Sequence, residues 1–391
     1  MVSFSLRSSN MKAVIAIDSF KGSLSTFEAG KAVAEGIRLA YPDAVTVISP
    51  LADGGEGTVD AVITATEGIR RKTAVWGPLG DKVEAEYGII PQSKTAVMEM
   101  AAAAGITLIE SERRNPLYTT TYGVGQMIAD AIDLGCREFV MGIGGSATND
   151  GGIGMLQALG FEFLDKAGNP VTRGGIGLKD ICTIRTENAN PLLKECRFRI
   201  ACDVSNTLCG EKGCSAVYGP QKGATPEMVK NMDMWLLNYA DLTLKATGKG
   251  DKDYAGAGAA GGLGFAFLSY LNSTLQSGIE IVMSVTGLAE KIADADIVIT
   301  GEGRLDGQSY MGKAPVGVAK LAKSMGKQVI AFAGGVTEDA RKCNEFGIDA
   351  FFPIVRQPCT LEKAMESEFA YGNLTATAEQ VFRLIKAQGT I

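Results

Sequence analysis

The stretch MGIGGSATNDGGIG, residues 141–154, holds six glycines and an uninterrupted run of five small or polar residues, 146–150. A strand pattern at 138–141 precedes it and an apolar helical pattern at 153–159 follows, which predicts a strand, a loop and a helix in succession. A plain turn needs only one or two glycines. The loop is therefore expected to bring its backbone close to a ligand beside a helix start, where N–H groups favour an anion.

Short apolar runs alternate with amphipathic helices at both ends of the chain, as in a parallel sheet covered on both faces. The run KAVIAI at 12–17 precedes a helical pattern at 27–41, and the alternation resumes after residue 295 with DIVITG and VIAFAGG. Between them, segments such as VEAEYGII and TAVMEMA indicate strands separated by turns. We expect an α/β protein in which a doubly wound Rossmann-like domain, 11–75 and 279–391, carries an inserted mixed α/β domain, 76–278.

This organisation predicts a cleft between the two domains. Residues 1–10 precede a second methionine, Met11, at which the first strand pattern begins. They are interpreted as an N-terminal extension without an assigned role.

The chain of 391 residues contains no histidine. Serine–histidine and cysteine–histidine nucleophiles are thereby excluded, as are the usual catalytic zinc sites. Proton transfer must use Asp, Glu, Lys, Tyr or Cys, and carboxylates favour a hard cation such as Mg²⁺. The eight cysteines show no zinc-knuckle spacing, so they are expected to be reduced thiols.

The formal net charge of −6 gives no basic footprint for nucleic acid or an anionic membrane surface. The start of the chain lacks the apolar core of a signal peptide, and no later run is apolar enough to span a bilayer. We therefore expect a cytoplasmic protein whose partners are small molecules. The sequence leaves the oligomeric state open, a homodimer included.

Charged loops follow several predicted strands, at the carboxyl ends where open α/β sheets bind ligands. Asp18 and Lys21 follow the first strand, Asp53 and Glu56 lie in a glycine-bearing loop after the second, and Asp203 ends the strand at 198–202. A charge beside a glycine is usually part of a solvated turn. Together, however, these loops supply lysines and carboxylates suited to phosphoryl transfer by positioning and electrostatics.

Residues 307–313 match the spacing GxxxxGK of a phosphate-binding loop, but Ala314 stands where such loops carry Ser or Thr. Chance spacing in a glycine-rich chain is an equally good interpretation of this pattern alone. A glycine loop, a lysine and a helix start nonetheless suit polyphosphate, and Glu302 and Asp306 could recruit a metal ion. The expected phosphate-binding residues are Gly301, Gly303, Gly312 and Lys313.

The segment GIGGSA, 142–147, also fits the dinucleotide pattern GxGxxA, with Glu162 twenty residues beyond Gly142. Asp150 argues against that interpretation, because a carboxylate repels a pyrophosphate unless a cation intervenes. The segment at 256–264, GAGAAGGLG, is either a closely packed helix or a source of N–H groups for an anion. The second alternative makes Gly256, Gly258, Gly261 and Gly262 cofactor-binding.

Seven motifs taken together resemble the bacterial glycerate kinases of the type-1 family. They are DSFKGSLS (18–25), ADGGEGT (52–58), GIGGSATNDGGIG (142–154), ACDV (201–204), GPQKGA (219–224), GAGAAGGLG (256–264) and ITGEGRLDGQS with GK (299–313). The resemblance extends from Met11 to the end of the chain. It implies two domains around a cleft and ATP- and Mg²⁺-dependent phosphorylation of D-glycerate, usually at the 2-hydroxyl; 3-phosphoglycerate stays an alternative product.

On this basis ATP and Mg²⁺ are expected at the 301–313 loop and the 256–262 stretch, with glycerate between the domains. Asp18 or Asp203 would accept the hydroxyl proton, and Lys21 would neutralise the substrate carboxylate or the transferring phosphoryl group. Asp53 and Glu56 are expected to bind the substrate. The same is expected of four residues in the loop at 141–154, which are Ser146, Thr148, Asn149 and Asp150. Two rival functions remain, an NAD-dependent dehydrogenase and a non-catalytic sugar-acid binding protein.

Overall fold

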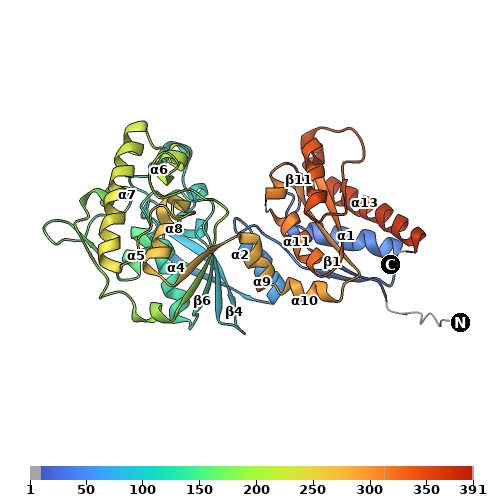
Figure 1. Cartoon of the computed structure of the whole chain (residues 1–391), viewed down its shortest axis with the longest axis horizontal. Helices are drawn as coiled ribbons and strands as arrows, with labels where there is room; N and C mark the ends of the chain where they lie inside the picture. Colours follow the sequence, from blue (N-terminus) through green and yellow to red (C-terminus); the bar gives the residue numbers. More distant parts are fainter. Residues whose placement is uncertain (1–9, 312, 390–391) are drawn as a thin grey trace. The chain divides into compact units, whose positions relative to one another are not determined.

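The computed structural model of the protein describes residues 10–311 and 313–389. The described chain forms two compact units (Figure 1). One contains the residues up to Asp53 and from Val282 onward, and the other contains 54–281. All but the last residue of the expected N-terminal extension, 1–10, lies outside the described residues, as does Gly312.

The first unit is built on a five-stranded parallel sheet with the strand order β13-β12-β11-β1-β2. Counted along the unit, this is the order 2-1-3-4-5 of a doubly wound sheet, whose switch point lies between β1 and β11. The expected doubly wound domain is thus present. Its elements are β1 (Lys12–Ile15), α1 (Thr26–Ala40), β2 (Val45–Ile48), α10 (Leu288–Ala293), β11 (Ile297–Leu305), η6 (Ser309–Met311), α11 (Ala314–Ser324), β12 (Gln328–Val336), η7 (Glu338–Phe346), β13 (Ala350–Pro353), α12 (Leu361–Met365) and α13 (Ser367–Gln388).

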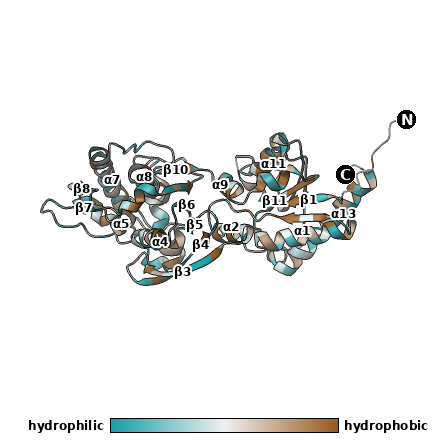
Figure 2. Ribbon diagram, turned by 90° about the horizontal axis from the view of Figure 1, so that it is seen from below, coloured by the Kyte–Doolittle hydropathy of each residue, from teal (hydrophilic) through white to brown (hydrophobic). Residues whose placement is uncertain are grey.

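Both faces of this sheet are buried, which explains its continuous apolar runs (Figure 2). Successive strand residues face opposite sides. Ala13 and Ile15 of β1 belong to the core that includes α1 and α13, whereas the equally buried Val14 lies outside that cluster. The helices α1 and α13 pack along each other, and α11 packs on β11 and β12. Polar loops follow the carboxyl ends of the strands.

The second unit contains a mixed six-stranded sheet with the order β10-β9-β6-β5-β4-β3, in which β4 runs antiparallel to the other five strands. A small antiparallel pair, β7 and β8, lies apart from it. The elements are α2 (Thr58–Thr66), β3 (Ile69–Trp76), β4 (Lys82–Ile90), β5 (Thr95–Glu99), α3 (Ala101–Ala104), η1 (Ile106–Leu108), η2 (Ser111–Arg113), α4 (Tyr122–Asp133), β6 (Glu138–Gly142), α5 (Ile153–Ala158), β7 (Glu162–Leu164), η3 (Gly175–Asp180), β8 (Thr183–Arg185), η4 (Pro191–Glu195), β9 (Arg197–Ala201), α6 (Cys214–Tyr218), η5 (Pro220–Lys222), α7 (Pro226–Thr247), α8 (Ala259–Tyr270) and β10 (Ser273–Gln276).

The boundaries between the units differ from the expected 75/76 and 278/279. The first lies after Asp53, because α2 packs on β4 and β5 and because β3 pairs with β4 along its whole length, from Ile69 opposite Ile89 to Trp76 opposite Lys82. The second lies within α9 (Gly278–Val285), after Ile281. Residues 54–75 resemble the first unit in local pattern, but their strand partners belong to the second.

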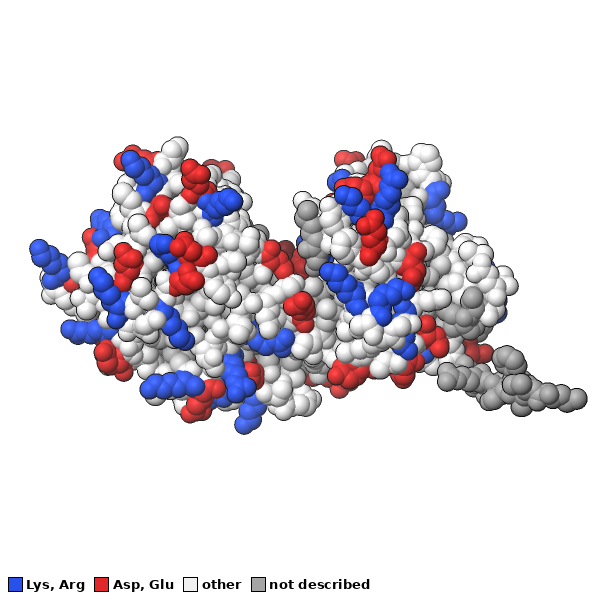
Figure 3. Space-filling model, viewed as in Figure 1, with Lys and Arg blue, Asp and Glu red and all other residues white. Residues whose placement is uncertain are grey.

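On the face shown in Figure 3, basic and acidic side chains are interspersed over each unit. Within the described ranges, no helix combines the length and the apolarity needed to cross a membrane. All eight cysteines are free thiols.

Candidate functional site

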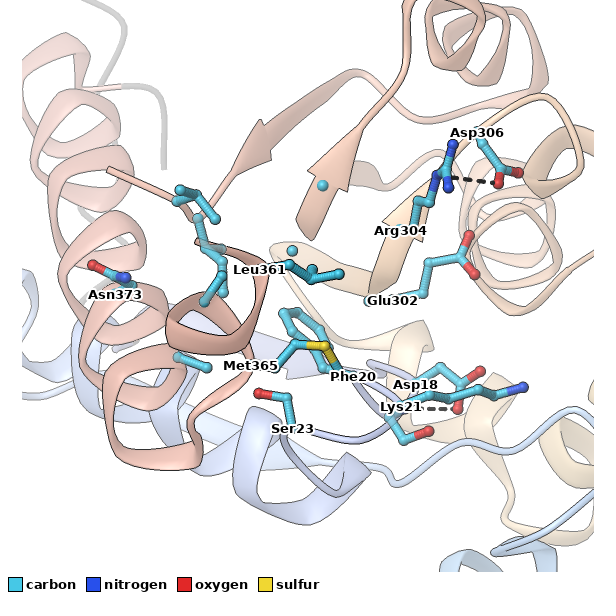
Figure 4. A pocket seen from close by; sticks show the side chains of 18 of the residues that line it. Asp18, Phe20, Lys21, Ser23, Glu302, Arg304, Asp306, Leu361, Met365 and Asn373 are labelled. Atoms are coloured by element: carbon cyan, nitrogen blue, oxygen red, sulfur yellow. Dashed lines mark hydrogen bonds and ion pairs between the residues drawn. The ribbon is translucent and has the colours of Figure 1, made fainter. Parts of the chain in front are cut away.

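A pocket of about 490 Å³ lies in the first unit, at the carboxyl ends of β1, β11, β12 and β13. Figure 4 shows its two chemical ends, one lined by charged side chains and the other by apolar ones. The charged end includes seven residues singled out from the sequence: Asp18, Lys21, Asp53, Glu302, Gly303, Asp306 and Lys313. They converge because parallel strands deliver their carboxyl ends to one edge of the sheet.

Asp18 follows β1 at the switch point, and its backbone N–H donates to Gly301 O of β11 at 2.9 Å. The side chain is buried, and burial raises the pKa of its carboxyl to about 6. The nearby charge of Asp53 raises this pKa further, while Lys21 opposes it. Ser19 N–H donates to Asp18 Oδ1 at 2.7 Å. Asp18 is thus a fixed carboxylate whose basicity is above that of an ordinary aspartate.

Glu302 lies on β11 and is also buried. Burial raises the pKa of its carboxyl, and the charges of Asp18 and Asp306 act in the same direction. Ser309, a fully buried residue of η6, donates from Oγ to Glu302 Oε1 and accepts at 3.1 Å from the backbone N–H of Asp306. Ser309 was not predicted from the sequence, because nothing in its local pattern shows that its hydroxyl faces Glu302.

Cationic side chains balance these carboxylates. Lys21 Nζ lies 3.4 Å from Asp53 Oδ2 and is largely exposed. Its pKa is raised, first by Asp53 and, after the opposing effect of burial, by Asp18 and Glu302. Lys313 is the N-terminal capping residue of α11, so it stands at a helix start beside the pocket. Arg304 lies 3.7 Å from Asp306.

The other end of the pocket is apolar, and the sequence did not predict it. Phe20, Ile354, Val355, Leu361 and Met365 line it. Leu361 is 75% exposed although it is a large apolar side chain. A signal was present in the sequence, since residues 354–365 follow the last strand of the sheet and so belong at the same edge as Asp18 and Glu302.

Gly301, one of the expected phosphate-binding glycines, does not line the pocket. A Cβ there would lie 2.0 Å from Phe332 O of β12, so this glycine permits two strands to pack closely. Gly303 and Lys313 are the described members of the predicted phosphate-binding loop that line the pocket. The prediction for Gly312 falls outside the described residues.

The run 146–150 of the loop at 141–154 lies in the second unit and is mostly buried there. Thr148, Asn149 and Asp150 have no exposed surface, whereas Ser146 is half-buried. Asp150 accepts hydrogen bonds from Thr121 N and Oγ1 at 2.8 and 2.9 Å and from Gly152 N at 3.1 Å. Its burial raises its pKa. Thr148, Asn149 and Asp150 are therefore enclosed within their own unit, and of the four residues Ser146 alone keeps an accessible surface. Their predicted ligand contacts stay predictions.

The four glycines Gly256, Gly258, Gly261 and Gly262 were expected to hold cofactor, but they are buried against their own unit. A Cβ at Gly258 would lie 2.1 Å from Thr207 O, and one at Gly261 would lie 2.1 Å from Thr148 O. Gly151 N also donates to Gly261 O at 2.9 Å. The two glycine-rich stretches therefore pack against each other, as the close-packing alternative expects. The cofactor contacts of these glycines stay a prediction.

The dinucleotide alternative meets an obstacle in the same unit. Glu162 lies on β7, in the two-stranded sheet apart from β6, and accepts from Asn188 Nδ2 at 3.0 Å. The dinucleotide motif places its acidic residue within the same βαβ unit as its glycine loop. GIGGSA therefore lacks the partner that would make it a nucleotide fingerprint.

The remaining predicted residues, Glu56 and Asp203, are exposed side chains of the second unit. Asp203 follows β9, and its Oδ1 accepts from Gly278 N at 3.3 Å.

The charged end of the pocket offers oxygen ligands for a metal ion. No group of three or more acidic or cysteine side chains in metal-binding proximity occurs in the described part of the chain. Mg²⁺ is usually held by one or two carboxylates together with substrate phosphates, however. Glu302 and Asp306, on one strand end with oxygen donors only, fit that smaller requirement.

Comparison with known proteins shows the family of this chain. The model of the glycerate kinase family matches residues 13–386. The glycerate kinase of Haemophilus influenzae is 49% identical over 96% of this chain and 99% of its own, and the glycerate 2-kinase of Escherichia coli is 47% identical over 95% and 97%. The crystal structure of a candidate glycerate kinase 2 from Salmonella typhimurium LT2 superposes with a TM-score of 0.90 at 45% identity, covering 98% of this chain and 100% of that one. The chain therefore belongs to the glycerate kinase family.

Proposed function

We propose that this protein is an ATP-dependent glycerate kinase that phosphorylates D-glycerate to 2-phosphoglycerate. One observation carries the placement of the chemistry: the pocket of the first unit joins an apolar end to an end with the buried carboxylates Asp18 and Glu302 and the lysines Lys21 and Lys313. The printed name of the E. coli relative, glycerate 2-kinase, supports the 2-hydroxyl as acceptor. 3-Phosphoglycerate is the alternative product.

The adenine of ATP would occupy the apolar end, against Phe20, Leu361 and Met365. The polyphosphate would then extend toward Lys21 and Lys313. The start of α11 adds the positive end of a helix dipole, which favours an anion. A nucleotide thus finds hydrophobic contact for its base and positive charge for its phosphates within one pocket.

Glu302 and Asp306 would hold Mg²⁺, which when bound supplies neutralisation of the charge on the phosphate oxygens. The geometry of these residues supports that role. Ser309 and the turn at Asp306 fix the Glu302 carboxylate, and Gln308 N–H fixes Asp306 Oδ1 at 2.8 Å. Burial next to Asp18 also makes the negative charge on Glu302 costly, and a cation would relieve that cost.

Asp18 is our first candidate for the residue that accepts the hydroxyl proton of glycerate. Ser19 N–H occupies Oδ1, so Oδ2 is the oxygen that would receive the proton. A pKa of about 6 keeps the carboxylate ionised at neutral pH and makes it a stronger base than a solvated aspartate. Lys21 would neutralise the substrate carboxylate or the transferring phosphoryl group. Asp203 remains the second candidate base, and Asp53 and Glu56 remain predicted substrate contacts.

Incubation of the purified protein with ATP, Mg²⁺ and D-glycerate tests the proposal. ADP should form only when glycerate is present, and phosphorus NMR of the product should show 2-phosphoglycerate. A change in nicotinamide absorbance with glycerate and NAD would favour a dehydrogenase instead. Binding of glycerate without ADP formation would favour a sugar-acid binding protein and would contradict the kinase assignment.

We further propose the cytoplasm as the compartment of this enzyme. The eight cysteines form no disulfide, as is usual in reducing compartments, and ATP is the expected donor. A homodimer stays a prediction, to be tested by light scattering of the purified protein.

A further inference from the structure

Lys222 is a buried lysine of the second unit that the proposed chemistry does not use. It is the last residue of η5, and only 2% of it is exposed. Its Nζ donates to Ser146 Oγ at 2.8 Å and to Thr148 O at 2.6 Å. No carboxylate lies within ion-pair distance of it among the described residues. A buried charge without a direct counter-charge is costly, so its presence calls for a function.

The acidic residue that acts on Lys222 is Asp150, which is already engaged by Thr121 and Gly152. The other titratable neighbour is the buried thiol Cys214 of α6, whose own burial raises its pKa to about 11. Cys214 is therefore neutral near pH 7. The positive charge of Lys222 is consequently directed toward Ser146, the one residue of its hydrogen-bonded group that reaches the surface.

The hydrogen bond from Lys222 also orients the Ser146 hydroxyl. An ammonium group has donors but no acceptor, so Ser146 Oγ must accept from Nζ. Its own proton must then point to another acceptor. Gly144 and Gly145, next to it in sequence, are exposed, and Gly145 has a φ of 70°. In the described part of the chain the backbone N–H groups of Gly144, Gly145 and Ser146 have no acceptor either.

A hydroxyl donor, three consecutive free N–H groups and a buried cation behind them form a surface that fits an oxyanion. We propose that Lys222 is a positioning residue that holds Ser146 as a hydrogen-bond donor to the carboxylate of glycerate. The inference rests on the proposed function for the identity of the anion. A carboxylate is favoured over a nucleotide phosphate, because the pocket of the first unit already supplies Lys21 and Lys313 for the phosphates.

The test compares wild-type protein with Lys222→Met, which keeps the length of the buried side chain but removes its charge and donors. We expect the KM for D-glycerate to rise at least tenfold, with the KM for ATP changed less than twofold. Lys230→Met, an exposed lysine of the neighbouring α7, is the matched control and should change neither constant. An unchanged KM for glycerate in folded Lys222→Met, or an increase in the KM for ATP alone, would overturn the inference.

A second measurement separates this role from a general effect on folding. The wild-type enzyme should discriminate D-glycerate from its uncharged methyl ester, and both Lys222→Met and Ser146→Ala should lose that discrimination. The double variant should be no worse than Lys222→Met alone, because the two residues act as one unit. Ser146→Ala, at a half-buried position, keeps the test available if Lys222→Met does not fold: full discrimination in this variant would contradict the inference.

The pH dependence gives an independent readout. Burial lowers the pKa of Lys222 to about 8, so its charge is present below that pH and lost above it. The wild-type affinity for glycerate, measured by calorimetry without ATP, should weaken as pH rises through about 8, and Lys222→Met should show no such step. If wild-type protein binds glycerate in this Lys222-dependent way but forms no ADP, the kinase proposal fails and the anion site stands. If the wild-type protein forms ADP but its glycerate affinity does not depend on Lys222, the kinase proposal stands and the anion-site inference fails.

Discussion

The backbone N–H of Asp18 donates a 2.9 Å hydrogen bond to the carbonyl oxygen of Gly301. This bond continues the pairing of β1 with β11 beyond the last residue of β1 and therefore fixes the position of Asp18 beside the carboxyl-terminal half of β11. Asp18 and Glu302, the residue after Gly301, consequently line the same pocket. Each is buried, and each carries a raised pKa to which the other or a neighbouring carboxylate contributes.

Asp18→Asn should lower kcat for D-glycerate by about 10²- to 10⁴-fold, the usual contribution of a general base. The KM for ATP should change little, because the amide keeps the shape of the side chain. Asp43→Asn, at an exposed position of the same unit, should leave kcat unchanged. Steady-state kinetics of these variants and of Asp203→Asn decide the base: wild-type kcat in both Asp18→Asn and Asp203→Asn would eliminate both candidates.

The activity should also depend on pH through Asp18. Burial raises the folded-state pKa of this carboxyl to about 6, and only the ionised form can accept a proton. kcat/KM should therefore fall about tenfold per pH unit below about 6 and level off above it. A profile of kcat/KM from pH 5 to 8 checks this expectation, and a flat profile down to pH 5 would exclude Asp18 as the base.

The same raised pKa predicts that the folding stability falls as pH rises, whereas the activity rises. Between pH 3.8 and about 6 the folded protein binds more protons at Asp18 than the unfolded chain does, so this group makes stability fall as pH rises through that window. Asp18→Asn should accordingly be more stable than wild type at pH 7, by up to about 3 kcal/mol, and no more stable at pH 3.5. Denaturant unfolding at several pH values measures the difference. An equal or lower stability of the variant at pH 7 would show that the buried, ionised carboxylate of Asp18 does not destabilise the folded protein.

Ser309→Ala should lower the apparent affinity for Mg²⁺ by about 10- to 100-fold, as loss of a group that orients a metal-binding carboxylate typically does. Glu302 loses its hydroxyl donor, and its pKa should rise further because that bond favours the ionised form. The readout is the Mg²⁺ concentration that gives half-maximal activity at saturating ATP. Ser324→Ala, exposed at the end of α11, provides the control. Identical Mg²⁺ curves for wild type and Ser309→Ala would remove Glu302 from the metal site.

Lys313→Met should raise the KM for ATP by about tenfold, the effect of losing roughly 1.4 kcal/mol of phosphate attraction, and should leave the KM for glycerate near its wild-type value. Lys320→Met on the same helix should not change either constant, since Lys320 does not line the pocket. Nucleotide titrations at fixed glycerate distinguish the two. If Lys313→Met instead raised the KM for glycerate alone, the charged end of the pocket would be the acceptor side.

Local pattern was sufficient for the charged end of the pocket. Asp18 and Asp306 follow buried strands, Glu302 lies near the carboxyl end of one, and Lys313 caps a helix. The carboxyl ends of parallel strands necessarily meet at one edge. The apolar end was not predicted, although residues 354–365 follow β13. An apolar side chain in a loop has the same local pattern whether it packs in a core or lines a pocket.

In the loop at 141–154, local sequence pattern did not predict which side chains are buried. Four of the five residues in the run SATND are polar, yet Ser146 reaches the surface while Asp150 is fully buried. The same holds for the glycines at 256–262, which could serve an anion or a close packing contact. The choice depends on residues such as Thr121 and Thr148, which are distant in sequence from their partners.

By itself, the sequence determined the α/β class, the absence of histidine chemistry, the positions of the charged strand-end loops and the resemblance to one kinase family, since these follow from periodicity, composition and ordered motifs. The tertiary structure alone decided that residues 54–75 belong to the second unit, that Gly301 and Gly261 serve packing, that Ser309 fixes Glu302 and that Lys222 lies buried behind Ser146. Each of these depends on contacts between segments remote along the chain, and burial and its effect on charge arise only when those segments meet.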